Sequence, residues 1–117
     1  MPTPTSSSPA PSVPSSSCRV FVPQERSEFD LTPALEYGEL VVLNHGGDVY
    51  HDATGMIREM RQKLQDITPE AFIMMIGDPI AIGAAVATAA SILGGNVKCL
   101  KWSRRNRRYL VIDMRLW

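Results

Sequence analysis

Two polar stretches supply the side chains best suited to metal binding or acid–base chemistry. Histidine and aspartate occur together between His45 and Asp48 and again at His51 and Asp52. Imidazole and carboxylate groups can hold a metal ion or act as a general base. The spacing offers neither an HxxxH pair on a helix nor a third, distant ligand, so no metal site is predicted. Polar loop residues that follow a strand are the simpler interpretation.

The second stretch is Gly77-Asp78-Pro79, which directly follows an apolar run. Aspartate before proline is typical of a helix start, with Asp78 at the N-cap and Pro79 at the first helical position. The alternative is that the helix N-terminus holds a ligand and Asp78 contacts a ribose hydroxyl or a metal. Neither GxGxxG nor GxxxxGK[ST] occurs in the chain, so no cofactor is predicted from a motif.

A basic stretch carries the strongest charge signal. Trp102 and Tyr109 flank four arginines, at positions Arg104, Arg105, Arg107 and Arg108. Arginine can pair with phosphates while aromatic rings stack on bases, which predicts binding to nucleic acid or to an acidic partner. The alternative is a solvated hairpin tip whose charges oppose edge-to-edge aggregation. The net charge of the whole chain is 0, which speaks against a broad nucleic-acid footprint.

Hydrophobic periodicity predicts five strands and two helices that must position these residues. Apolar, β-branched runs predict strands over 19–22, 39–43, 71–76, 97–102 and 109–116. Helices are predicted over 56–67, with Asp52 or Thr54 as the cap, and over 79–93, ended by Gly94 and Gly95. Pro23 either ends the first strand or restricts it to an edge. In the last strand, alternation predicts that Ile112 and Leu116 face inward and that Tyr109 faces outward. Asn106 is expected to take the positive φ of the hairpin loop.

The order β-β-α-β-α-β-β predicts a mostly parallel sheet, with an antiparallel C-terminal hairpin at its edge. The fold class is therefore α/β, a small three-layer Rossmann-like sandwich. Ligands of such sheets bind beyond the carboxyl ends of the strands. If strands 39–43 and 71–76 are neighbours, the loops that follow them face each other. The ligand-binding candidates are then Asn44, His45, Gly46, Asp48, Gly77 and Asp78.

Composition divides the chain into a tail and one domain. Residues 1–17 are rich in Ser, Pro and Thr, which predicts a disordered tail ahead of a single domain over residues 18–117. Cys18 and Cys99 form no disulfide framework, and no secretory leader is present, so a cytoplasmic protein is expected. The uncharged segment Pro79–Leu93 is shorter than the roughly 20 apolar residues that span a bilayer. No membrane partner is expected, whereas the exposed edge strand could join a protein partner or a second copy.

Part of the chain resembles a pattern that recurs in small uncharacterised proteins of tailed bacteriophages. The stretch that carries it is IMMIGDPIAIGAAVATAASILGGNVKCLKWSRRNRRYLVIDMRL, and ELVVLNHGGDVY belongs to the same pattern. The matching features are Gly-Asp-Pro after an apolar strand, an Ala-rich helix, a Leu-Lys-Trp strand and an Arg-rich turn. The resemblance covers residues 39–117 and implies a phage protein made in the host bacterial cytoplasm. It implies no activity and assigns no functional residue.

The leading functional hypothesis is a non-enzymatic phage accessory protein that acts as an interaction or small-ligand-binding module. It rests on a credible core without a complete catalytic set. One alternative is a small nucleotide-binding domain or enzyme that uses the loops at the carboxyl edge of the sheet. The other is nucleic-acid binding through the basic hairpin.

Overall fold

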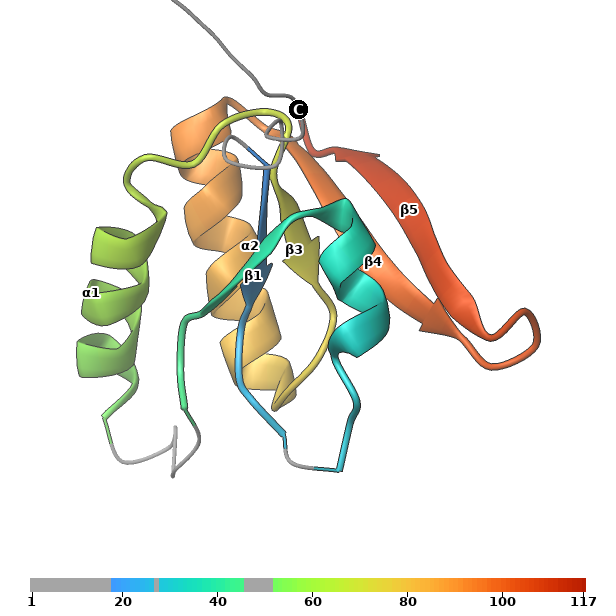
Figure 1. Cartoon of the computed structure of the whole chain (residues 1–117). Helices are drawn as coiled ribbons and strands as arrows, with labels where there is room; N and C mark the ends of the chain where they lie inside the picture. Colours follow the sequence, from blue (N-terminus) through green and yellow to red (C-terminus); the bar gives the residue numbers. More distant parts are fainter. Residues whose placement is uncertain (1–17, 27, 46–51) are drawn as a thin grey trace, which may run out of the picture.

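A five-stranded sheet forms the centre of the molecule in the computed structural model, which describes residues 18–26, 28–45 and 52–117 (Figure 1). The strand order is β2-β1-β3-β4-β5. Four strands are parallel, and β5 pairs with β4 in the antiparallel sense. The strands are β1 (Arg19–Val22), β2 (Glu39–Val42), β3 (Phe72–Met74), β4 (Asn96–Ser103) and β5 (Arg108–Arg115). The α/β class and the C-terminal hairpin are thus confirmed, while the predicted tail 1–17 lies outside the described residues.

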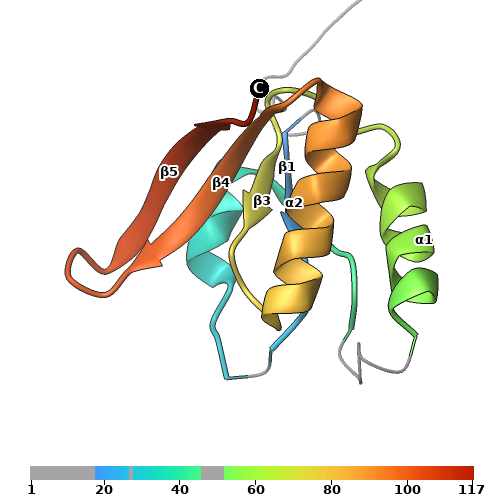
Figure 2. The same cartoon turned by 180° about the vertical axis from the view of Figure 1, so that it is seen from behind.

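Two α-helices pack on one face of the sheet. Helix α1 (Ala53–Leu64) begins at Asp52, whose side chain accepts a hydrogen bond from the Gly55 N–H at 2.9 Å. Helix α2 (Pro79–Leu93) ends at Gly94, which is left-handed with φ 79°. The predicted cap residues and the glycine stop are confirmed because they depend only on local backbone geometry. Figure 2 shows α2 in front of the sheet and α1 beside it.

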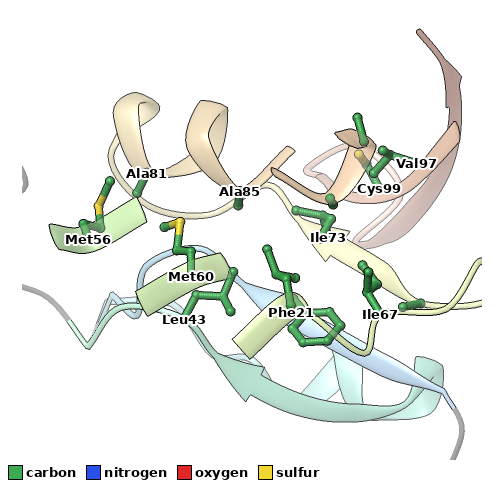
Figure 3. Close-up of a cluster of buried hydrophobic side chains, with 14 residues drawn as sticks. Phe21, Leu43, Met56, Met60, Ile67, Ile73, Ala81, Ala85, Val97 and Cys99 are labelled. Carbon is green, nitrogen blue, oxygen red and sulfur yellow. The ribbon is translucent and has the colours of Figure 1, made fainter. Parts of the chain in front are cut away.

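The larger hydrophobic core lies between these helices and the sheet. Figure 3 shows side chains of α1, α2 and the strands meeting there. Phe21 of β1 and Met60 of α1 are fully buried, as are Ala81 and Ala85 of α2. Alanine at these positions lets α2 approach the sheet closely. Among the described helices, none combines the length and apolar character needed to cross a bilayer.

A short 3₁₀ helix covers part of the opposite face. This element, η2 (Thr32–Tyr37), connects β1 to β2 and packs Ala34 against Val20, Val22 and Leu100. The Tyr37 ring meets Phe72 edge-on, with 5.6 Å between their centroids. Figure 1 shows η2 in front of the sheet, on the side opposite α2. The sequence analysis assigned no element here, because a single 3₁₀ turn carries no hydrophobic period to detect.

Several local expectations were wrong. Of the two roles predicted for Pro23, ending the first strand is confirmed and restricting it to an edge is wrong, because β1 lies inside the sheet. The loop residue with positive φ is Arg107, at 54°, not Asn106. Helix α2 does not extend over this part of the hairpin, so Ile112 and Leu116 remain 40% and 44% exposed instead of facing a core.

Candidate functional site

The Gly77-Asp78-Pro79 junction joins β3 to α2 at the carboxyl edge of the sheet. Asp78 is the N-cap, and its carboxylate accepts a hydrogen bond from the Ile80 N–H at 2.9 Å. Pro79 occupies the first helical position and brings no N–H of its own. Gly77 has φ +122°, a conformation that side-chain-bearing residues rarely adopt. The helix-capping role predicted for Asp78 is therefore confirmed.

Gln24, which the sequence analysis missed, locks this junction to the end of β1. Its side chain is 6% exposed, and its Oε1 accepts a hydrogen bond from the Asp78 N–H at 2.6 Å. A Cβ on Gly77 would lie 2.5 Å from the Cβ of Gln24. The signal in the sequence was a glutamine directly after a buried strand and Pro23, at the edge where loops converge. Gln24 thus fills the crevice between β1 and β3.

The second predicted loop is linked to the same segment. Strand β1 separates β2 from β3, so the condition under which the two loops would adjoin is not met. The Glu25 N–H instead donates to the carbonyl of Asn44 at 2.9 Å, and Glu25 Oε1 lies 3.3 Å from Nδ1 of the exposed His45. The candidates Gly46 and Asp48 lie outside the described residues. His45 and Glu25 line an open hollow of about 700 Å³ beside η2.

A better-defined cavity of about 600 Å³ opens on the other side of the segment that follows β1. It joins three parts of the chain: residues 26 and 28–33, the end of β3, and the part of the β4–β5 hairpin next to its turn. The lining residues are Arg26, Glu28, Phe29, Asp30, Pro33, Met75, Ile76, Gly77, Lys101, Trp102, Arg104 and Tyr109. The predicted candidates Gly77, Trp102, Arg104 and Tyr109 therefore meet at one place, which the sequence analysis did not foresee.

Unequal strand lengths create this cavity. Strand β3 ends at Met74, which pairs with Leu100, whereas β4 continues to Ser103. The Met75 N–H donates to the Leu100 carbonyl at 2.9 Å, so the main-chain groups of Leu100 point toward β3. Main-chain direction alternates along a strand, so the N–H and C=O of Trp102 point the same way, past the end of β3. The overhang therefore presents peptide groups as well as side chains to the cavity.

Aromatic rings form one wall. Trp102 and Tyr109 pair across the hairpin, with ring centroids 5.0 Å apart and planes at 69°. Tyr109 is buried, and its hydroxyl lies 3.9 Å from Sδ of Met74. Trp102 is 40% exposed and Phe29 is 50% exposed. A buried ring thus holds Trp102 in one orientation while much of the indole surface remains available.

Some charged side chains around the cavity form ion pairs or hydrogen bonds in the described structure, whereas two cations form no ion pair. Arg26 bonds to Glu28 at 2.6 Å, and this bond lowers the pKa of the Glu28 carboxyl. Hydrogen bonds from the side chain and main chain of Thr32 lower the pKa of Asp30. Burial, and then the charge of Asp30, raise the pKa of Tyr109. Within the described part of the chain, no ion pair involves Lys101 or Arg104, so both cations remain available to an anion.

The other three arginines of the hairpin lie outside the cavity. Arg105, Arg107 and Arg108 are exposed, and none of them lines it. The Asn106 N–H donates to Ser103 Oγ at 3.1 Å and shapes the turn. Across residues 18–26, 28–45 and 52–117, no cluster of three or more His, Cys, Asp or Glu side chains could hold a metal ion. The cations and aromatic rings that line the cavity could pair with an anion and stack against a planar ring.

Comparison with known proteins gives a family but no activity. The family model described as "Phage Pam3 gp32-like protein" matches residues 18–116, from the residue before β1 to the end of the C-terminal hairpin. The chain belongs to this family. The predicted phage origin is confirmed in this sense, and the match also includes β1 and η2, which the resemblance over residues 39–117 did not. No curated protein and no solved structure matched the chain.

Proposed function

We propose that this phage protein is a non-enzymatic binding module that takes a small anionic ligand with a planar ring. The observation that carries the proposal is the cavity of about 600 Å³ beyond the end of β3. Lys101 and Arg104 offer positive charge there, and Trp102 offers an exposed ring for stacking. The combination suits a nucleotide-like molecule, and the module is proposed to act in the cytoplasm of the infected bacterium.

The proposed architecture is a reduced Rossmann-like sandwich in which η2 stands in for a full helix. The order β2-β1-β3-β4 supports it, together with crossovers on opposite faces of the sheet. In such sheets the ligand crevice lies where the strand order reverses, here between β1 and β3. Gln24 fills that crevice and bonds to Asp78. The proposed ligand therefore binds one strand further along, between β3 and the overhang of β4.

Binding of a mononucleotide tests the proposal. Trp102 and Trp117 are the two tryptophans, so Trp117→Phe leaves the indole of the cavity as the single tryptophan, whose fluorescence can be excited separately from that of the tyrosines. We expect nucleoside monophosphates to quench this fluorescence and to raise the melting temperature. Neutralising Lys101 and Arg104 together should weaken binding about tenfold or more, because each supplies a charge-assisted contact. Arg61→Ala, on the exposed face of α1, is the control and should leave affinity unchanged.

Two results would overturn this function. One is the absence of quenching and of any thermal shift with nucleotides and other ring-bearing anions, with or without Mg²⁺. The other is chemical conversion of the bound ligand, detected by chromatography, which would make the module an enzyme. Either result is readable because Lys101 and Arg104 are exposed and their replacement leaves the core intact.

The exposed tip arginines support a second candidate, binding of single-stranded nucleic acid. Arg105 and Arg107 lie in the turn of the hairpin and Arg108 is the first residue of β5, so all three are close in the chain to the Trp102–Tyr109 pair. Affinity for an oligonucleotide should then fall steeply with salt. Replacing these three arginines with glutamine should abolish oligonucleotide binding while leaving mononucleotide binding in place. If oligonucleotide affinity is unchanged by the triple replacement, the second candidate fails.

A further inference from the structure

Strand β5 is an edge of the sheet that carries exposed apolar side chains on both faces. Its sole strand neighbour among the described residues is β4, and no helix lies beyond it in either view (Figures 1 and 2). The exposed fractions are 49% for Val111 and 40% for Ile112 in the strand, and 44% for Leu116 and 77% for Trp117 directly after it. So much apolar surface along one free edge is unusual, because edge strands are ordinarily short or heavily charged.

The main chain of this edge is oriented for pairing. The Leu116 N–H donates to the Gly95 carbonyl at 2.7 Å, so the main-chain groups of Leu116 point toward β4. Hydrogen-bonded and non-hydrogen-bonded positions alternate along an antiparallel pair. The N–H and C=O groups of Val111, Asp113 and Arg115 therefore point away from β4. They form a ladder edge that another strand can bind.

Residues 111–117 are complementary to the same segment read in the opposite direction. The segment is Val-Ile-Asp-Met-Arg-Leu-Trp, which has two apolar residues at each end and an acid and a base on either side of Met114. We propose that a second copy of the chain pairs antiparallel with this segment, about a two-fold axis at Met114. The two sheets then join into one continuous sheet across the dimer.

In this register every side chain of the segment meets a suitable partner. Asp113 lies opposite Arg115 of the second copy, and by symmetry the same ion pair forms twice. Ile112 lies opposite Leu116, and Val111 lies opposite Trp117, so all four exposed apolar side chains are covered. Opposite charges and apolar pairs directly across strands are the combinations that stabilise a sheet. The Trp117 ring rests on Gly95, where an added Cβ would come within 2.9 Å of it, and most of the residue remains exposed.

Neighbouring registers fit less well. An axis at Asp113 would set two aspartates opposite each other, which is destabilising. An axis at Ile112 would set Asp113 opposite Val111 and leave the charge without a partner. The register at Met114 also avoids Tyr109, whose carbonyl is already 3.4 Å from the Tyr37 hydroxyl. Charge complementarity therefore selects a second copy in one register, independently of any ligand in the cavity.

Charge reversal tests the pairing on the full chain. Light scattering coupled to size exclusion should give a dimer mass that dissociates on dilution. Asp113→Arg alone, or Arg115→Asp alone, sets like charges opposite each other twice and should raise the dissociation constant about tenfold or more. The two single variants have complementary edges, so mixing them should restore a dimer that contains one of each. The double variant, in which acid and base are exchanged, should dimerise as the natural chain does.

Matched controls carry the same charge changes elsewhere. Asp66→Arg near the end of α1 and Arg105→Asp at the hairpin tip lie outside the segment, and both should leave the dimer intact. Circular dichroism confirms that each variant is folded. A monomer mass for the natural chain from micromolar to millimolar concentration overturns the proposal and leaves the edge to a strand of another protein. A dimer that neither single variant weakens, or that mixing does not restore, overturns it as well.

Discussion

The crevice between β1 and β3 and the cavity beside the β4 overhang lie at the same carboxyl edge of the sheet, yet their polar groups are used differently. In the crevice, the buried Gln24 side chain bonds to the Asp78 N–H, and the Asp78 carboxylate bonds to the Ile80 N–H. In the cavity, Lys101 and Arg104 take part in no ion pair within the described chain, and the Trp102 ring is 40% exposed.

The difference separates groups that hold the fold from groups that are available to a ligand. A buried polar side chain is expensive unless it has a partner, so the bond between the buried Gln24 and the Asp78 N–H is structural. Exposed cations and rings cost little to leave unpartnered, and their convergence on one hollow calls for another explanation. Substitutions in the crevice should therefore change stability, whereas substitutions in the cavity should change binding.

The largest effect is expected at Gly77. Gly77→Ala adds a Cβ that meets the Cβ of Gln24 at 2.5 Å, on a backbone with φ +122°. Strain and overlap together should lower the free energy of unfolding by about 3 kcal/mol. Urea denaturation followed by circular dichroism measures this change.

Gly83 supplies the control for that measurement. It lies within α2, with open space where a Cβ would be added. Gly83→Ala should raise stability by about 0.5 to 1 kcal/mol, because alanine favours the helix. Equal effects at the two glycines would show that Gly77 is not held against Gln24, and the crevice would then be as open as the cavity.

A smaller loss of stability is expected at Gln24. Gln24→Ala leaves the Asp78 N–H without its 2.6 Å partner and should cost about 2 kcal/mol. Gln62→Ala on the exposed surface of α1 removes the same side chain and should change stability by less than about 0.5 kcal/mol. Neither substitution should alter mononucleotide affinity. A tenfold loss of affinity in a folded Gln24→Ala protein would place the ligand in the crevice and contradict the comparison.

The features that could be predicted from the sequence are those that depend on interactions between residues close together in the chain. Asp52, Asp78 and Gly94 were identified because caps and helix stops depend on neighbouring residues. The contact between Gln24 and Asp78 joins residues 54 positions apart, so no local sequence pattern predicts it. The cavity exists because β4 continues several residues past the end of β3. Hydrophobic patterns define the ends of strands poorly, so this difference in length could not be predicted.

The burial of side chains on β5 shows the same limit of prediction from the sequence. Alternation correctly separated the two faces of the strand but could not say which face a helix covers. Tyr109 was expected to face outward and is 6% exposed, because η2 and Met74 pack beneath it. Ile112 was expected to face inward and is exposed, because α2 does not extend so far. Strand order decides both outcomes, and strand order depends on contacts distant in sequence.

The smallest expected effect concerns the titration of Tyr109, which reports on the cavity itself. Burial and then the Asp30 carboxylate raise the pKa of its phenol, so the folded protein favours the neutral form. The free energy of unfolding should therefore fall as the pH rises past the ordinary tyrosine pKa of about 10, and Tyr109→Phe should remove that share of the slope. Asp30→Asn keeps an oxygen acceptor for Thr32 but removes the charge, so it should lower the Tyr109 pKa part of the way. Ultraviolet difference titration, with Tyr109→Phe to assign the signal and Glu70→Gln as the distant control, measures the change.

A bound anion adds negative charge beside the Tyr109 ring and should raise the pKa of the phenol further. The increase should be smaller when Lys101 and Arg104 are neutralised. If saturating mononucleotide leaves the Tyr109 titration unchanged, the phosphate of the nucleotide does not enter this cavity. The crevice and the cavity would then differ only in how tightly their side chains are packed.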